Sequence, residues 1–350
     1  MSEIKEMVVE VVEKIFKDKV EKETVDLLEE NKWAEDIWQL LLENELHHVA
    51  VSEEDGGAGG DIEDLLALYE LVGKYAAPVP YVEHTLANFL LQQVELKGYE
   101  QLTTYSITTP LQLKGDALFG TLKHVGWAQY AKKLVTMAQE GSQQFIVVAD
   151  LQDAQLKNST NLAAEPRSEV VFENLKALQK VPVSEKQYDV FKKFVTAASV
   201  SKMGGALTTA FQLSVQFSKE REQFGRPIHR FQLVQQHLAS MAGEQTLMTV
   251  AVNNIRTLLA AGREEREVAY ARLRMDDASR TVATSAHQVH AAIGVTHEHR
   301  LHQYTRRLWA WRDEEFTARY WKKQLAQQLL ETKIDLWESI TDQAETHVHA

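Results

Sequence analysis

Ten residues, KEREQFGRPI at positions 219–228, decide the fold class of this 350-residue chain. They end a long apolar pattern at helical spacing, and Gly225 and Pro227 stop that helix before a second one begins. The junction supplies a guanidinium fork, an aromatic face and an amide: Arg221, Phe224 and Gln232. Such groups suit a nucleotide diphosphate. The alternative is a solvated helix end in which the Phe224 side chain only packs against other apolar residues.

A second stretch, HQVHAAIGVT at positions 287–296, ends another helical pattern and turns through Gly294. The small residues Ala291, Ala292 and Gly294 permit the close backbone approach that a dinucleotide site requires. The alternative is a tight turn between two helices, with a histidine whose ring nitrogens are hydrogen-bonded within the fold.

Outward from these stretches, the chain divides into three parts. Helical periodicity fills residues 1–102 and returns, with longer helices, over residues 184–350. Between them, residues 103–183 carry short runs rich in Thr, Val, Ile and aromatics, of which 145–149 is the clearest buried strand. We therefore predict a mostly α fold with a β insert: an N-terminal helical domain, a small middle β domain and a C-terminal helical bundle, with these boundaries.

Local signals mark helix ends in the N-terminal part. Residues 52–60 form an acidic, Gly-rich loop. Asp61 is predicted to cap the helix that follows, with Asp64 at its third position in an approximate capping box. The segment 77–80 holds two prolines and breaks the helix pattern.

The composition argues against several classes of function. The formal net charge is −12, so binding to nucleic acid or to anionic membranes is not expected as a main role. The chain has no cysteine, which excludes disulfides, thiol catalysis and thiolate metal sites; no metal site is predicted, and a reducing cytoplasm is the expected location. The N-terminal segment 1–20 lacks the apolar core of a signal peptide. No run approaches the roughly 20 apolar residues that span a bilayer.

Taken together, the two stretches resemble the acyl-CoA dehydrogenase family. Its third domain carries an Arg-x-x-Phe-Gly…Gln stretch and, further along, a Gln-x-x-Gly-Gly-x-Gly turn. The matching residues are Arg221, Phe224, Gly225 and Gln232, then Gln288 and Gly294 with Ala292 in place of a glycine, and finally Glu298, Tyr304 and Arg306. In the other parts, residues 53–59 resemble the family's Pro-Glu-x-x-Gly-Gly-x-Gly loop, 70–73 its Glu-Glu-x-Gly helix and 118–123 its Gly-x-Lys strand.

The resemblance implies a fold, a cofactor and a reaction. The fold is a helical domain, a middle β domain and a C-terminal four-helix bundle, with FAD between the last two and completed by a second subunit. In the reaction, a carboxylate removes the α proton of an acyl-CoA thioester, the β hydride passes to the flavin N5, and the electrons leave to an electron-transfer flavoprotein. The residues implied in FAD binding are Arg221, Phe224, Gln232, Gln288, Ala292 and Gly294.

The resemblance also suggests a catalytic base. In many members a Glu-Gly pair follows the arginine matched by Arg306 by nine residues, which leads to Glu315, although Phe316 stands where glycine is usual. Because Glu315 ends an acidic triplet, the alternative is an exposed acidic helix face. Other members place their glutamate at the position of Val195, where this chain has no base.

Two departures from the family pattern affect the flavin site. Residues 103–115 lack the Thr-Glu-Pro…Gly-Ser-Asp stretch that holds the flavin in the family, and Ala291 and Ala292 replace the paired glycines. The compact middle domain is similar to members that act on steroid side chains or other bulky acyl-CoAs, some of which pair unlike subunits.

The leading hypothesis is therefore an acyl-CoA dehydrogenase-like flavoprotein of lipid metabolism that forms a homo- or hetero-oligomer, a dimer or a tetramer. Within the family, this chain is either a competent homo-oligomer that uses Glu315 or the degenerate member of a heteromeric pair. A hypothesis from another class is a catalytically inactive assembly subunit that keeps the fold for contacts alone.

Overall fold

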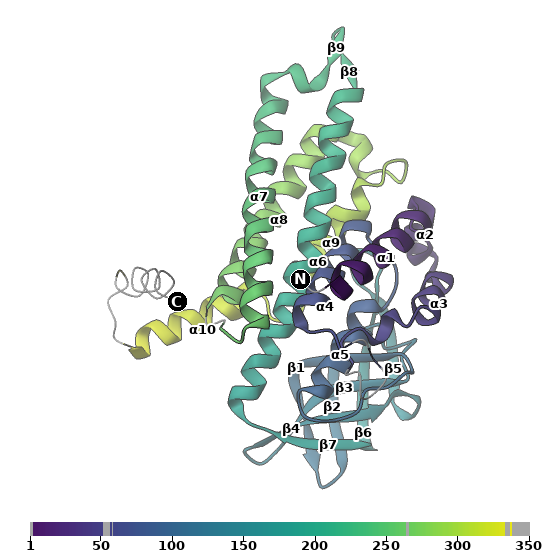
Figure 1. Ribbon diagram of the computed structural model, residues 1–350, viewed down its shortest axis with the longest axis vertical. Helices are drawn as coiled ribbons and strands as arrows, with labels where there is room; N and C mark the ends of the chain where they lie inside the picture. The colour runs from purple at the N-terminus through teal and green to yellow at the C-terminus, as the bar shows by residue number, and fades with distance from the viewer. Residues whose placement is uncertain (1–2, 52–56, 58, 264–265, 333–336, 338–350) are drawn as a thin grey trace.

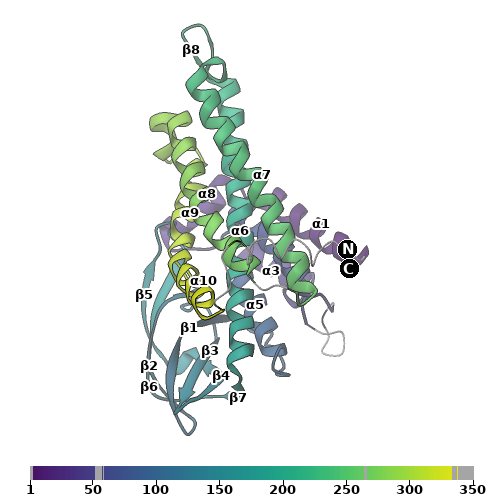
Figure 2. The same ribbon diagram turned by 90° about the vertical axis from the view of Figure 1, so that its left-hand side faces the viewer.

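The structure, a computed structural model, describes residues 3–51, 57, 59–263, 266–332 and 337 (Figure 1). Its helical N-terminal part lies beside a long bundle, and a sheet lies at one end of that bundle (Figures 1 and 2). This order of elements confirms the predicted fold class. Among the described residues, none of the helices combines the length and the apolar composition of a membrane-spanning segment.

The N-terminal part is built from short helices around one apolar core. Its α-helices are α1 (Glu3–Lys19), α2 (Lys22–Asp26), α3 (Glu35–Glu43), α4 (Ile62–Tyr75) and α5 (Tyr81–Gln92), with 3₁₀ turns η1 (Leu27–Glu30) and η2 (Leu46–His48). The capping box predicted at the start of α4 is confirmed. The Asp61 carboxylate accepts from the Asp64 N–H at 3.1 Å, and the Asp64 carboxylate accepts from the Asp61 N–H at 2.9 Å.

The middle part is a seven-stranded sheet with the order β5-β6-β2-β1-β3-β4-β7. Its strands are β1 (Thr103–Lys114), β2 (Ala117–Gly126), β3 (Lys133–Glu140), β4 (Gln143–Asp150), β5 (Gln155–Thr160), β6 (Pro166–Lys176) and β7 (Gln179–Val183). Neighbouring strands are antiparallel except β1 and β3, which are parallel.

The strand predicted over residues 145–149 lies within β4 and is buried on both faces. Ile146 and Val148 belong to the core shared with the helices, whereas Val147 and Ala149 belong to a second core formed within the middle part. A strand covered on both sides needs apolar residues at every position, which explains the uninterrupted apolar run.

The C-terminal part is dominated by α6 (Glu185–Glu220), which packs against α7 (Gln232–Ala260), α8 (Glu267–His290) and α9 (Leu301–Arg312). A small hairpin, β8 (Glu222–Gln223) and β9 (Arg226–Pro227), lies between α6 and α7 and is followed by the turn η5 (Ile228–Arg230). The turn η6 (Ala291–Val295) separates α8 from α9, and α10 (Ala318–Thr332) follows. The hairpin and the sheet lie at opposite ends of the bundle (Figures 1 and 2).

Two glycines bring α4 directly against α6. A Cβ atom added at Gly73 would lie 1.7 Å from the Lys202 carbonyl oxygen, and one added at Gly205 would lie 1.9 Å from the Glu70 carbonyl oxygen. Only glycine permits such an approach of two backbones. The segment 70–73 that resembles the family's Glu-Glu-x-Gly helix therefore fixes the position of Lys202 on α6.

Candidate active site

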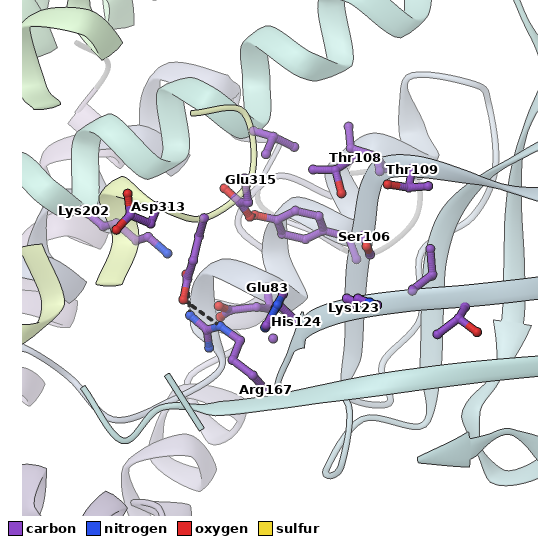
Figure 3. A pocket seen from close by; sticks show the side chains of 17 residues that line it. Glu83, Ser106, Thr108, Thr109, Lys123, His124, Arg167, Lys202, Asp313 and Glu315 are labelled. Carbon is purple, nitrogen blue, oxygen red and sulfur yellow. Dashed lines mark hydrogen bonds and ion pairs between the residues drawn. The ribbon is translucent and has the colours of Figure 1, made fainter. Parts of the chain in front are cut away.

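A cavity of about 460 Å³ lies where the sheet meets α5, α6 and the turn between α9 and α10 (Figure 3). Strands β1 and β2 form one wall, with hydroxyl groups from Ser106, Thr108, Thr109 and Thr121. The opposite wall comes from helices and from the α9–α10 turn, and it carries most of the charge. Its charged residues are Glu83 from α5, Lys202 from α6, and Asp313, Glu314 and Glu315 from the turn.

Glu315 lies in the cavity wall and not on an exposed helix face. It is half-buried in the turn after α9, with φ 55°. The Tyr105 hydroxyl donates to Glu315 Oε1 at 2.5 Å, while Oε2 is buried and has no hydrogen-bond partner among the described residues. Burial raises the pKa of the Glu315 carboxyl, although the Lys202 ammonium and the Tyr105 hydrogen bond oppose this. Glu315 therefore presents a free oxygen in an environment that favours accepting a proton.

The neighbouring glutamate has a structural role. Glu314 accepts two hydrogen bonds from Arg167, from Nε at 3.0 Å and from Nη2 at 2.7 Å. Arg167 also donates to Glu165 at 3.2 Å, and Glu165 pairs with Arg307 at 3.1 Å. Burial alone would raise the pKa of Glu165, but Arg307 and Arg167 lower it to about 2. This network fastens the turn that carries Glu315 to strand β6.

A buried arginine holds the same turn from the other side. Arg272 on α8 donates to the carbonyl oxygens of Trp311, Arg312 and Glu314 at 3.0, 2.9 and 3.2 Å, and to Ser199 Oγ at 2.9 Å. The last carbonyls of a helix have no partner within that helix. Arg272 supplies partners for them at the end of α9 and so sets the start of the turn.

The residues matched to the family's Arg-x-x-Phe-Gly stretch lie far from this cavity. Arg221 ends α6 and is exposed, and Phe224 is 92% exposed in the hairpin. From Lys202 to Arg221 the helix rises by roughly 28 Å, at about 1.5 Å per residue. Arg221 and Phe224 therefore do not reach the cavity of their own chain.

The turn at the end of α8 lies near the same end of the bundle as the hairpin. The Phe217 ring, close to the end of α6, stacks on His290 with a centroid distance of 4.3 Å. The other residues implied in FAD binding are here: Gln288 and Ala292 are exposed, Gly294 is buried, and Gln232 is exposed at the start of α7. The structure thus gathers these residues and Arg221 and Phe224 at one end of the bundle, and leaves Glu315 at the other.

The backbone of this turn requires a glycine at one position and strains an alanine at another. A Cβ atom added at Gly294 would lie 2.9 Å from His290 Cβ, so the close approach of the turn to α8 requires glycine. Ala291, in place of a family glycine, has φ 53° and ψ −141°, a conformation that costs an alanine of the order of 1–3 kcal/mol.

Sequence reasoning missed several cavity residues. Strand β1, which lacks the family's flavin motif, supplies Tyr105, Thr108 and Thr109. Lys202 had a usable signal, because it is the only charged residue between Lys193 and Lys219. Within the segment 118–123 that resembles a Gly-x-Lys strand, residues 121–123 line the cavity. The loop match at residues 53–59 falls largely outside the described residues.

One group of side chains away from the cavity has metal-ligand character. Asp26, His297 and His302 bring their ligand atoms within 4.8 Å of one another. The Asp26 carboxylate already accepts from Lys22 at 2.6 Å and from Gln303 at 2.7 Å, so its charge is compensated. The cluster is explained by these contacts and does not require an ion.

Comparisons with known proteins agree with this architecture. Two family models match the chain, "Acyl-CoA dehydrogenase, N-terminal domain" over residues 2–102 and "Acyl-CoA dehydrogenase, C-terminal domain" over residues 195–313. The acyl-CoA dehydrogenase IpdE2 of Mycolicibacterium smegmatis is 26% identical over 320 residues, which is 88% of this chain and 93% of that protein. The acyl-CoA dehydrogenase FadE27 of Mycobacterium tuberculosis is 26% identical over 312 residues, 79% of this chain and 83% of the relative.

Solved structures share the fold at lower identity. The ChsE4-ChsE5 complex from Mycobacterium tuberculosis contains a chain that matches with a TM-score of 0.84 and 21% identity, over 95% of this chain and 98% of that one. A glutaryl-coenzyme A dehydrogenase bound to glutaryl-CoA matches with a TM-score of 0.80 and 19% identity, over 95% and 96% of the two chains.

Proposed function

Because this chain belongs to the acyl-CoA dehydrogenase family, whose members are FAD-dependent oxidoreductases, we propose that it catalyses the α,β-dehydrogenation of an acyl-CoA thioester with Glu315 as the base. The observation that carries the proposal is the free Oε2 of Glu315, buried and without a hydrogen-bond partner among the described residues. Abstraction of an α proton needs a positioned base whose pKa is raised toward the operating pH. Glu315 combines that position with that shift.

The surrounding residues of this chain orient the base. Tyr105 holds Glu315 Oε1, and Oε2 keeps no hydrogen-bond partner among the described residues. Arg272 fixes the backbone carbonyls before Glu315, and Arg167 fixes the adjacent Glu314. A base held at several points loses little entropy when the substrate arrives, which favours reaction.

The residues present fit FAD in two parts. The wall formed by β1 and β2 offers backbone groups and the hydroxyls of Thr108, Thr109 and Thr121 for the flavin ring. The charged fork and stacking face suited to the adenosine diphosphate part are Arg221 and Phe224, at the far end of the bundle. We assign that part to the hairpin of a second subunit. When bound, FAD accepts the hydride that leaves the β carbon.

An oligomer follows from this division of the site. The α7 helix carries the exposed apolar side chains of Leu233, Leu247 and Val250, whose helical spacing places them on one face. We propose that this face packs against a second subunit, a copy of this chain or a related one, and that an electron-transfer flavoprotein takes the electrons. Pairing with an unlike subunit is suggested by Phe316 and Ala291, which stand where the family has glycine.

Rapid mixing of the assembled enzyme with a panel of acyl-CoAs tests the base. Glu315→Gln keeps the shape of the side chain, so the flavin content should not change while flavin bleaching slows by about 10²–10⁴. Glu185→Gln, at an exposed site in the first turn of α6, is the matched control and should bleach like wild type. Equal bleaching in wild type and Glu315→Gln would move the base to the partner subunit.

A further inference from the structure

The cavity wall carries an ammonium group, that of Lys202, to which no described residue hydrogen bonds. Lys202 is 6% exposed, and its Nζ lies 4.7 Å from the centroid of the Trp311 ring. Across the described residues, no hydrogen bond or ion pair to this ammonium is present. The ammonium opens onto the cavity, where a ligand oxygen can accept a hydrogen bond from it.

The carboxyl group of Glu83, on another helix, also has no hydrogen bond to another described residue. Glu83 on α5 lines the cavity, and a Cβ atom added at Gly126 would lie 3.4 Å from Glu83 Oε1. Among the described residues, no other residue hydrogen bonds to the Glu83 side chain. Burial raises the pKa of Glu83 to about 7, with Lys202 and Arg167 opposing the shift. Figure 3 shows Glu83 and Lys202 reaching the cavity from different helices.

Two other charged residues of the cavity, Arg167 and Glu315, already have interaction partners within the chain. Arg167 binds Glu314 and Glu165, and one oxygen of Glu315 accepts from Tyr105. The free oxygen of Glu315 is the one assigned to the α proton. Lys202 and Glu83 are therefore available to bind other parts of the substrate.

The charge of the lining selects the kind of substrate atom. Four acidic and three basic side chains line the cavity, Glu83, Asp313, Glu314 and Glu315 against Lys123, Arg167 and Lys202. A ligand carboxylate beside Lys202 would also lie among these four carboxyl groups, whereas a neutral oxygen brings no charge to them. Such an oxygen accepts a hydrogen bond from the Lys202 ammonium, and a hydroxyl also donates to Glu83.

We infer that the acyl group carries a neutral hydrogen-bonding oxygen, a hydroxyl or a ketone, which Lys202 and Glu83 bind. The inference rests on the proposed function, because it takes this cavity as the acyl-CoA site. A plain alkyl chain would cover both polar groups without replacing their hydration. Sites built to hydrogen bond a substrate group discriminate strongly against analogues that lack it, and we expect a preference of roughly tenfold or more here.

Titration calorimetry on the full-length chain, together with any subunit that copurifies, tests the inference. The probes are octanoyl-CoA, hydroxyoctanoyl-CoA isomers whose hydroxyl moves along the chain, and the ω-carboxy analogue. At least one hydroxy isomer should bind about tenfold or more tightly than octanoyl-CoA. Lys202→Met should remove that advantage, and Lys186→Met, at an exposed site on the same helix, should keep it.

The outcomes separate the two proposals. If octanoyl-CoA binds as tightly as every hydroxy isomer, or the ω-carboxy analogue binds most tightly, the inference is wrong and the proposed function stands. If no thioester binds, the cavity is not an acyl-CoA site, and both the inference and the proposed function are wrong. Should Lys202→Met fail to fold, Glu83→Gln provides the second variant. An unchanged preference for the hydroxy isomers in Glu83→Gln would remove Glu83 from the assignment, and a reduced preference would support it.

Discussion

Replacing Arg272 by methionine should destabilise the protein and slow its chemistry together. The change removes the donor to three carbonyl oxygens at the end of α9 and to Ser199. A buried acceptor left without a partner costs about 1–3 kcal/mol. Residues 312 and 314 are only half-buried, so water replaces part of the loss. Burial also lowers the pKa of Arg272, which means that the charged side chain is itself costly to bury.

These terms give a net loss of about 3 kcal/mol in the free energy of unfolding, at the low end for breaking a buried charged network. Urea denaturation followed by circular dichroism measures it. Arg280→Met on the same helix is the control, because Arg280 is exposed and pairs only with Asp277 among the described residues; its loss should stay below about 0.5 kcal/mol. The turn that carries Glu315 should also loosen, so turnover should fall by roughly 10–100-fold at unchanged flavin content. A loss below about 1 kcal/mol would refute the reasoning, since the carbonyls would then have found other partners.

Three further predictions concern other parts of the molecule. Arg221→Ala should lower the affinity of the assembled enzyme for FAD by about tenfold or more, because one charge-assisted hydrogen bond is lost. Unchanged flavin content after dialysis would contradict the assignment of Arg221 to FAD binding. Gly205→Ala should lower the free energy of unfolding by about 3 kcal/mol or more, because the added Cβ would meet the Glu70 carbonyl oxygen. Gly243→Ala on α7 has open space around the added Cβ and should raise the free energy of unfolding by about 0.5–1 kcal/mol, as measured by thermal melts. The pKa of Glu83 is raised from its usual value near 4.5 to about 7, so its stabilising contribution is complete below pH 4.5 and is lost as the pH rises through 7; that decline should be absent in Glu83→Gln, and identical pH profiles would contradict it.

Local features of the fold could be predicted from the sequence because each depends on neighbours in the chain. The capping box of Asp61 and Asp64 spans three residues, and the apolar run of β4 reports burial on both faces. The order of helices, sheet and helices follows from hydrophobic periodicity, which changes from one part to the next.

The cavity could not be assembled in the same way, because its contacts join distant parts of the chain. Tyr105 meets Glu315 across 210 positions, and Arg167 meets Glu314 across 147. Periodicity carries no information on such pairs. The acidic triplet looked like a solvated face because three acids in a row are usually exposed. In the structure the three differ: Asp313 is exposed, Glu314 binds Arg167, and Glu315 faces the cavity.

The hairpin after α6 is better explained by a binding role than by stability of the single chain. Phe224 is 92% exposed and has φ 53°, which costs a bulky residue free energy and gains no burial. Its ring nevertheless makes an edge contact with Phe231, and the Arg226 guanidinium lies 4.4 Å from the centroid of the same Phe231 ring. These contacts form within the single chain, and any order that they give the tip before binding lowers the entropy lost on binding. A strained, solvent-facing aromatic three residues from Arg221 is what the proposed second half of a flavin site requires, so the cavity of one subunit and the hairpin of another would form a single site.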